Sequence, residues 1–464
     1  MNLKDYIVSI DLGCSKVVAA LGTLGANGEV IVADFATCPM PANGFVRGEI
    51  TNIEVVTKAL KGAVSELESR NNIIVSDVFV SVEGRHIVCA DNSGFVYIGS
   101  DGEILEENVK QLSENMNNVQ APEGKVILSR IPQSYKIDSR EIVGNPVGMY
   151  GKQLEATYSF LLAGKGVLER IGKAFDRVGI NGYKFCAAAS ATAQVAATSD
   201  EKEMGVAVID LGAGVTNVAI YHDGVLRYAV SIPMGQETIN KDIKANAIPD
   251  KHIEKLKIKY GYATVSAIPF NELNSVIRID GRTQHEKAKN IPFRDLCTII
   301  NARMLDIVEF VVEEIRTSGY HGKLGAGIVL TGGGSQLKGI DTLFKERTGY
   351  EVRLGWAEEG VGAESVEGIS APTMTTAVGL LALAFSEDIG HIKAPKYITK
   401  SQEVDRQEEE LKKNGKKEKS GDGEGDKEPQ TEKSGKKKLG WFKRVIGRID
   451  EAIFGQEVVG DEDM

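Results

Sequence analysis

An internal repeat constrains the fold more than any other feature of this 464-residue sequence. The segment YIVSIDLGCSKVVAALG begins at Tyr6, and VAVIDLGAGVTNVAIY begins at Val206. Each copy is an apolar strand that ends in Asp-Leu-Gly, followed by a tight turn of small residues and a second apolar strand. Further strands follow at Glu29 and Val225. This pattern predicts a β-meander in each half of the chain, so we expect two similar domains that face one another.

Both tight turns have the composition of phosphate-binding loops, because small residues let backbone N–H groups converge on a phosphate tail. The first turn offers Asp11, Gly13, Cys14, Ser15 and Lys16, and the second offers Asp210, Gly212, Ala213, Gly214 and Thr216. The carboxylates of Asp11 and Asp210, at strand ends, could orient waters on a phosphate-bound Mg²⁺. Either turn alone is equally compatible with an ordinary glycine-containing hairpin, whereas the matched pair favours phosphate binding.

A third glycine-rich element lies near the end of the apolar part of the chain. The segment LTGGGSQL begins at Leu330, where a buried strand is expected to enter a helix through Gly332, Gly333 and Gly334. Bare backbone could approach a purine or ribose closely there, and a helix N-terminus favours phosphate. Structural strand-to-helix turns also use glycine, so this element alone is weak evidence.

The order of these three elements resembles the phosphate-1, phosphate-2 and adenosine motifs of the actin/Hsp70/hexokinase superfamily. Several segments are similar to the bacterial FtsA family of division proteins: GFVRGEITN from Gly44, GVAVIDLGAGVTNVAIY from Gly205, IEKLKIKYGYA from Ile253, AGIVLTGGGSQLKGI from Ala326 and TAVGLLALA from Thr376. The resemblance covers roughly residues 5–392 and the C-terminal helix. It implies an α/β, actin-like fold of duplicated ribonuclease H-like domains that binds ATP with Mg²⁺.

The resemblance also implies a division into subdomains. These are 1A (1–83, 164–203 and 376–392), 1C as an SHS2-like insertion (84–163), 2A (204–240 and 319–375) and 2B (241–318). By pattern alone, the inserted segment is only a small α+β unit. Elsewhere the patterns predict helices at 52–70, 166–178, 236–246, 250–259, 293–318, 336–346 and 373–385.

By resemblance, Glu254 and Lys257 contact the ribose or adenine, together with the glycines 332–334 and Gln336. A three-residue spacing places Glu254 and Lys257 on one helical face. Without the family resemblance, this spacing would indicate only a charged face exposed to solvent. Two departures, Ala213 and an Asn217 where relatives often have Asp, put metal-assisted hydrolysis in doubt. Only Gln194 offers a side chain that could orient water on the Ala-rich helix after Cys186, so we expect slow or negligible ATP turnover.

The chain beyond Lys400 has a different composition. Residues 393–435 are rich in Glu, Lys, Gly and Ser and predict a disordered linker. Residues 436–456 regain helical periodicity and predict an interfacial membrane helix, which binds reversibly alone and more tightly in an oligomer. Its membrane-facing and basic residues are Leu439, Trp441, Phe442, Lys443, Arg444, Val445, Ile446, Ile449, Ile453 and Phe454. A helix docked in a protein groove is the alternative, and the acidic end GDEDM weakens attraction to anionic lipid.

Composition excludes several other classes of protein. The formal net charge of -10 argues against a nucleic-acid binder. The five cysteines are scattered without a CxxC pair, which disfavours a disulfide framework or zinc site and fits a reducing cytosol. No secretory signal and no run of 18 apolar residues are expected.

The resemblance implies a scaffold rather than an enzyme, at most a slow ATPase. Such a protein polymerises on the cytoplasmic face of the inner membrane at the septum. It anchors FtsZ, whose tail docks on subdomain 2B, and recruits later division proteins through subdomain 1C. The alternatives are a PilM-like pilus-assembly adaptor, against which the C-terminal helix argues, and a small-metabolite kinase, for which no convincing catalytic base is found in the sequence.

Overall fold

The computed structural model describes residues 6–142, 144–281, 285–386 and 396–397. The predicted membrane helix and its lipid-facing residues lie outside the described residues. Of the predicted linker, the structure describes only β20 (Lys396–Tyr397), which pairs antiparallel with β6 (Ile73–Ile74). These two residues therefore form a short strand where the composition predicts disorder.

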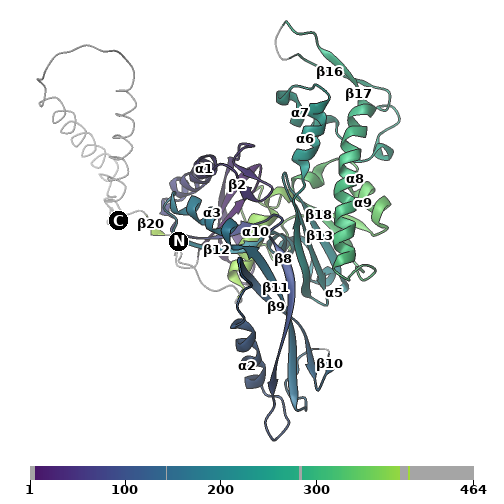
Figure 1. Cartoon of the computed structure of the whole chain (residues 1–464). Helices are drawn as coiled ribbons and strands as arrows, with labels where there is room; N and C mark the ends of the chain where they lie inside the picture. Colours follow the sequence, from purple (N-terminus) through teal and green to yellow (C-terminus); the bar gives the residue numbers. More distant parts are fainter. Residues whose placement is uncertain (1–5, 143, 282–284, 387–395, 398–464) are drawn as a thin grey trace, which may run out of the picture. The chain divides into compact units, whose positions relative to one another are not determined.

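Two five-stranded sheets repeat the same topology (Figure 1). The first has the order β12 (Gly182–Ala187), β7 (Asp77–Val82), β1 (Ile7–Leu12), β2 (Lys16–Leu24), β3 (Val30–Pro39). The second has the order β19 (Val352–Leu354), β18 (Gly327–Thr331), β13 (Val206–Leu211), β14 (Thr216–His222), β15 (Val225–Ile232). In each sheet the meander is antiparallel, and its first strand pairs parallel with the neighbouring strand. The predicted duplication is confirmed.

Register explains why the two Asp-Leu-Gly turns are equivalent. Asp11 pairs with Val18 across the first hairpin, and Asp210 pairs with Asn217 across the second. In both copies the glycine that follows Asp-Leu closes the turn: Gly13 N–H donates to the carbonyl of Lys16 at 3.1 Å, and Gly212 N–H donates to that of Val215 at 3.0 Å. Each aspartate therefore lies at the same end of its sheet, immediately before the turn.

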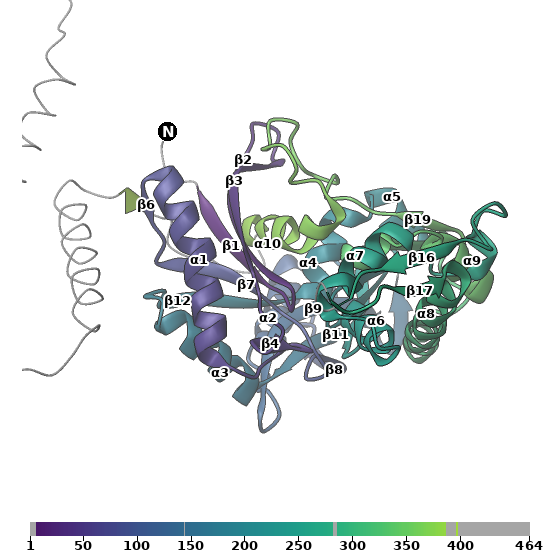
Figure 2. The same ribbon diagram turned by 90° about the horizontal axis from the view of Figure 1, so that it is seen from above.

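Helices cover the two sheets and pack against each other between them. Helix α1 (Ile53–Asn71) packs on β2 and β3, and α10 (Thr375–Phe385) packs on β1, β2 and β7 (Figure 2). Helix α4 (Ala188–Ala196) packs on β13, β14 and β15 and against α10. A Cβ on Gly379 would lie 1.8 Å from the carbonyl oxygen of Ala191, so this glycine permits the close crossing of α10 and α4.

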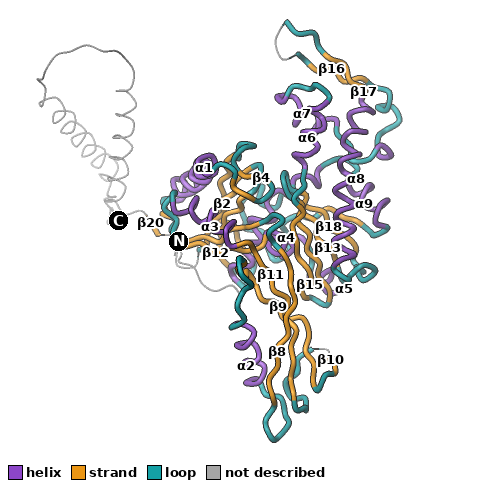
Figure 3. The backbone as a smooth tube through the Cα atoms, in the orientation of Figure 1, coloured by secondary structure: helices purple, strands orange, loops and turns teal. Residues whose placement is uncertain are grey.

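The inserted segment forms a four-stranded sheet with the order β10 (Arg140–Ile142), β9 (Lys125–Ile137), β11 (Gln153–Gly164), β8 (Val88–Tyr97), visible as long orange strands in Figure 3. Helix α2 (Glu106–Asn117) lies on β8 and β11 around a separate apolar core. The sequence pattern predicts two short strands, 86–89 and 95–98, where β8 is continuous. It likewise predicts strands 125–131 and 135–137 where β9 is continuous. Gln133 of β9 donates to the carbonyl of Leu226 at 3.0 Å, which joins this unit to β15.

The remaining elements complete the two halves. In the first half, β4 (Phe45–Val46) pairs with β5 (Glu49–Ile50), and α3 (Lys165–Asp176) packs beside α1. Helix α5 (Ser199–Met204) lies in the connection between the two halves. The second half contains α6 (Gln236–Ala245), α7 (Asp250–Tyr260), the hairpin β16 (Val276–Ile279) and β17 (Lys289–Pro292), and the long α8 (Phe293–Thr317). Among the described residues, no helix is long and apolar enough to cross a bilayer.

The predicted helix 336–346 begins later than expected. A 3-10 turn, η3 (Gly333–Gln336), follows the glycines, and α9 (Ile340–Thr348) starts only after Gly339 in a left-handed conformation. The glycine run therefore does not sit at an α-helix N-terminus. The expectation that a helix N-terminus there favours phosphate is wrong, and the glycines can act only through their bare backbone.

Candidate functional site

A cavity of about 580 Å³ lies where the two Asp-Leu-Gly turns meet. Its lining comes from both halves of the chain and from all three predicted motifs. The lining residues are Asp11, Gly13, Cys14, Ser15, Lys16, Met40, Ala42, Glu83, Asp210, Gly212, Ala213, Gln236, Glu237, Asn240, Glu254, Lys257, Ile258, Gly332, Gly333, Gly334, Gln336, Leu337, Pro372, Thr373 and Thr376. All but two of the predicted phosphate, adenosine and metal residues are in this set.

The first turn is held against the neighbouring strand by Ser81 on β7. The Ser81 hydroxyl donates to Oδ1 of Asp11 at 2.7 Å and accepts from the Leu12 N–H at 3.0 Å. Lys16 begins β2, and its Nζ lies 3.4 Å from Sδ of Met374. A soft thioether is a weak partner for an ammonium, so the Lys16 charge remains available to an anion in the cavity.

The second turn is positioned by the start of α6. The N–H groups of Gln236 and Glu237 donate to the carbonyls of Gly212 and Ala213 at 3.0 and 2.7 Å. These bonds fix the orientation of both peptide groups beside the cavity. A Cβ on Gly235 would lie 2.6 Å from both carbonyl oxygens, so only glycine lets the helix approach the turn this closely.

Two predicted phosphate residues do not line the cavity. The Thr216 side chain is fully buried, and its hydroxyl donates to the carbonyl of Met234 at 2.9 Å. Gly214 packs against the first turn, where a Cβ would lie 2.6 Å from Sγ of Cys14. The suggested water-orienting Gln194 is also outside the lining, with its Oε1 3.4 Å from the Tyr221 hydroxyl.

Bare backbone brings the third motif against the second. Gly332 has φ +80°, and a Cβ there would lie 2.1 Å from Oδ1 of Asp210. A Cβ on Gly334 would lie 2.6 Å from Nε2 of Gln236, which is itself buried. These glycines allow close packing of β18, β13 and α6 and leave a smooth wall in the cavity.

The predicted pair on α7 forms a polar network at the other end of the cavity. Lys257 is buried, and its Nζ lies 2.9 Å from Oε2 of Glu254 and 3.0 Å from Oδ1 of Asn240 on α6. The Asn240 amide in turn donates to Oε2 of Glu254 at 2.8 Å. Exposed Ile258 and buried Leu337 supply apolar groups to the lining nearby. A flat heterocycle with polar edges fits this combination of groups.

Sequence reasoning missed Glu83, which follows β7 and lines the cavity beside both aspartates. Its Oε2 accepts from Nδ2 of Asn217 at 3.1 Å, and its Oε1 lies 3.7 Å from Sγ of Cys14. The same Asn217 amide donates to Oδ2 of Asp210 at 3.1 Å. One neutral amide thus bridges a carboxylate from each half of the molecule.

The carboxylates at this end of the cavity lack full charge compensation. Burial and the nearby Asp11 charge raise the pKa of Glu83 to about 8, and burial raises the pKa of Asp210 to about 6. Burial also raises the pKa of Asp11 and lowers that of Lys16. Within the described part of the chain, no group of three or more acidic, histidine or cysteine side chains could hold a metal ion directly. A cation in the cavity would nevertheless relieve the repulsion among these oxygens.

Two duplicated α/β domains, with a polar cavity between their matched turns, define an actin-like protein. A family model described as "Cell division protein FtsA" matches residues 207–379, and one described as "SHS2 domain inserted in FTSA" matches residues 84–161. The chain is 30% identical over 383 residues to the cell division protein FtsA of Neisseria meningitidis, covering 82% of this chain and 90% of that protein. It is 29% identical over 407 residues to FtsA of Escherichia coli K12, covering 86% and 95%.

This chain therefore belongs to the FtsA family of cell division proteins. Among solved structures, the PilM-PilN type IV pilus biogenesis complex matches with a TM-score of 0.55 and 14% identity, over 82% of this chain and 98% of the matched chain. At that identity the likeness concerns the fold alone.

Proposed function

We propose that the protein binds ATP with Mg²⁺ in the cavity and works as a membrane-attached scaffold for cell division. The observation that carries this proposal is the meeting of both Asp-Leu-Gly turns, the glycine wall and the Glu254–Lys257 pair around one cavity. Its volume suits a nucleotide, since ligand sites of this kind measure roughly 300–1,000 Å³. Membership of the FtsA family supports the role in division.

In this proposal the phosphates lie between the two turns. Backbone N–H groups from Cys14 to Lys16 and at Ala213 face them, with the Ser15 hydroxyl and the Lys16 ammonium as further donors. The adenosine lies against Gly332–Gly334 and Gln336, with Glu254 and Lys257 at its polar edge. Gly13 and Gly212 contribute by shaping the turns, because their own N–H groups are already bonded.

Carboxylate oxygens are the ligands that Mg²⁺ takes from proteins, often through water. Asp11 and Asp210 flank the phosphate end and are held by Ser81 and Asn217. They would orient waters on a magnesium ion whose direct ligands are mainly phosphate oxygens. When bound, that ion supplies positive charge to the phosphates and to these buried carboxylates.

The subdomain boundaries expected from the sequence belong to the same proposal. The 84–163 insertion would serve contacts with neighbouring subunits and later division proteins, and the 241–318 region would receive the FtsZ tail. Residues 436–456 would hold the polymer at the cytoplasmic face of the inner membrane. We propose no catalytic role beyond slow ATP turnover.

Equilibrium binding of a fluorescent ATP analogue, with and without Mg²⁺, tests the nucleotide site. We expect Mg²⁺-dependent binding that K16Q weakens about 10-fold or more, since hydrogen bonds to charged groups contribute about 1.5–3 kcal/mol. The matched control is K61Q, which removes an exposed lysine on α1. Equal affinity of K16Q and wild type, or no binding at all, would remove the proposed site.

A further inference from the structure

Glu83 occupies a rigid position at the phosphate end of the cavity. It follows β7, which Ser81 ties to the first turn through Asp11 and Leu12. On its other side the backbone meets the turn between β4 and β5, where a Cβ on Gly48 would lie 2.1 Å from the Glu83 carbonyl oxygen. The side chain therefore projects into the cavity from a point fixed by two neighbouring elements.

Two donors from opposite halves of the molecule orient the carboxylate. The Asn217 amide reaches Oε2 at 3.1 Å, and the Cys14 thiol lies 3.7 Å from Oε1. The Asn217 amide is held in one orientation, because the Ser231 hydroxyl donates to its Oδ1 at 2.6 Å. Each oxygen of Glu83 keeps a lone pair for a further hydrogen bond.

We propose that Glu83 is the general base of a slow ATP hydrolysis in this cavity, an inference that rests on the ATP binding proposed above. Glu83 accepts a proton from a water molecule as the water oxygen bonds to the terminal phosphorus. The bond from that phosphorus to the bridging oxygen breaks, and its electron pair leaves with ADP. Inorganic phosphate and ADP are released, and Glu83 returns its proton to solvent.

The surroundings of Glu83 suit this role. A general base works best when its pKa lies near the working pH, and burial beside Asp11 and Asp210 raises the pKa of Glu83 to about 8. The charged or titratable groups around it are Asp11 on β1, Asp210 on β13 and Cys14 in the first turn. The base acts when deprotonated, so the rate should rise with pH through the pKa of Glu83.

The same arrangement explains Asn217. An aspartate at this position would place three carboxylates within hydrogen-bonding distance beside the cavity, since Asn217 contacts both Glu83 and Asp210. An amide donates to both instead. Asn217 is the departure that, from the sequence, puts hydrolysis in doubt. In the structure it is the donor that allows the Glu83 carboxylate to lie beside Asp210.

Phosphate release from Mg²⁺-ATP, measured from pH 6 to 9 on the full chain, tests the role of Glu83. We expect E83Q to release phosphate at least 100-fold more slowly at pH 8, with no rise as pH increases and with ATP affinity within about 3-fold of wild type. The control E66Q, at an exposed position on α1, should match wild type. N217D should shift the rise in rate to higher pH, because its added charge raises the pKa of Glu83.

The outcomes separate this inference from the function on which it rests. An E83Q protein that binds ATP and hydrolyses it at the wild-type rate would overturn the inference and leave nucleotide binding intact. Wild-type protein that binds ATP without hydrolysis above background at any pH would do the same. Absence of ATP binding by wild type would remove the proposed function itself.

Discussion

Three carboxylates share the end of the cavity at which the two Asp-Leu-Gly turns meet, and one amide allows two of them to lie close together. Asn217 donates to Glu83 and Asp210, while Ser81 donates to Asp11. Desolvation disfavours their charged forms, and each charge disfavours the others. Without a ligand, the close approach of these carboxylates therefore costs electrostatic free energy. A bound Mg²⁺ and its waters would reduce that cost.

This cost gives the nucleotide-free protein a distinctive pH dependence. An ordinary glutamate has a pKa near 4.3 when unfolded, whereas Glu83 has a folded pKa of about 8. Between these values the folded protein binds the extra proton, so stability falls as pH rises through this window. We expect E83Q to raise the free energy of unfolding by about 1–2 kcal/mol at pH 8, allowing for partial solvent screening, and by much less at pH 5. Thermal unfolding at both pH values measures this difference, and an equal gain at each would contradict it.

At this scale, local spacing predicted the turn residues but not their partners. Gly13, Lys16 and Gly212 are adjacent to Asp-Leu repeats, so their roles follow from the turn itself. Thr216 and Asn217 are neighbours on a strand and point to opposite faces, and Asn217 rather than Thr216 faces the carboxylates. Glu83 could not be found from sequence, since only the parallel pairing of β1 with β7 brings it to Asp11.

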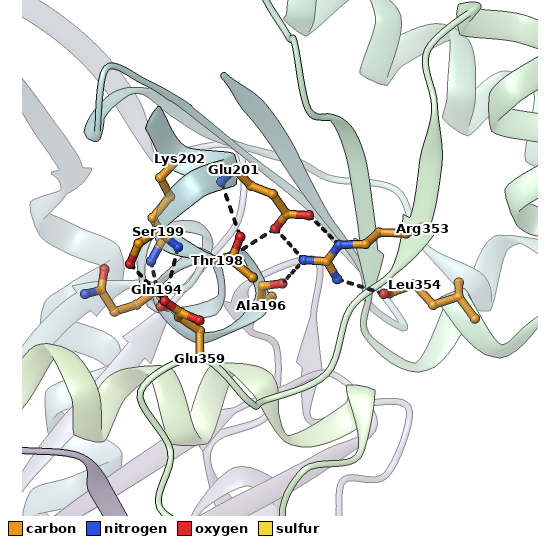
Figure 4. Close-up of polar contacts among 9 residues, drawn as sticks. All are labelled: Gln194, Ala196, Thr198, Ser199, Glu201, Lys202, Arg353, Leu354 and Glu359. Carbon is orange, nitrogen blue, oxygen red and sulfur yellow. Dashed lines mark hydrogen bonds and ion pairs between the residues drawn. The ribbon is translucent and has the colours of Figure 1, made fainter. Parts of the chain in front are cut away.

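At the level of elements, the two halves of the molecule are fastened where the chain passes between them (Figure 4). Arg353 on β19 forms a two-pronged ion pair with Glu201 on α5, through its Nε and Nη2 groups. It also donates to the carbonyl of Ala196, the last residue of α4, at 3.0 Å. Glu359 accepts from the Ser199 hydroxyl at 2.9 Å. The chain segment that follows α4 and the segment that follows β19 both pass between the two halves, and these contacts join them.

These contacts around Arg353 and Glu359 should stabilise the packing of the two domains against each other. R353K keeps the charge but loses the planar fork, and we expect it to lower the free energy of unfolding by about 1–2 kcal/mol, discounted because the side chain is partly exposed. Thermal unfolding of R353K, E201Q and the double variant forms a cycle that isolates the pair. R347K, at an exposed pair with Glu309 on α8, is the control. Fully additive effects of R353K and E201Q would contradict the proposed coupling.

Periodicity predicted most elements because helices such as α1 and α8 bury a continuous stripe, and the meanders alternate between tight turns. It failed at α9, where Gly333–Gln336 form a 3-10 turn that helical periodicity does not distinguish. It also divided β8 and β9, since polar residues such as Asp91 and Asn92 in an exposed strand look like turns. The pairing of β20 with β6 joins residues more than 300 positions apart and has no local signal.

At the scale of the whole molecule, the proposed scaffold role includes attachment to a membrane surface. The proposal assigns this attachment to residues 436–456, whose sequence pattern predicts an interfacial membrane helix. Deleting residues 436–464 should abolish co-sedimentation with vesicles of anionic phospholipid. Deleting only residues 460–464, which include three acidic side chains, should strengthen it, because each charge near such a surface changes binding by about 1 kcal/mol. Undiminished sedimentation of the longer deletion would place the membrane contact elsewhere and favour a peptide-recruited adaptor.

The duplicated turns are equivalent by topology, register and internal hydrogen bonds, and they face one cavity. A high-resolution structure of the full chain with Mg²⁺ and a non-hydrolysable ATP analogue tests their shared role most directly. We expect the phosphates between residues 13–16 and residues 212–213, with the purine against Gly332–Gly334. A cavity that stays empty at saturating nucleotide, or a phosphate chain bound away from either turn, would contradict it.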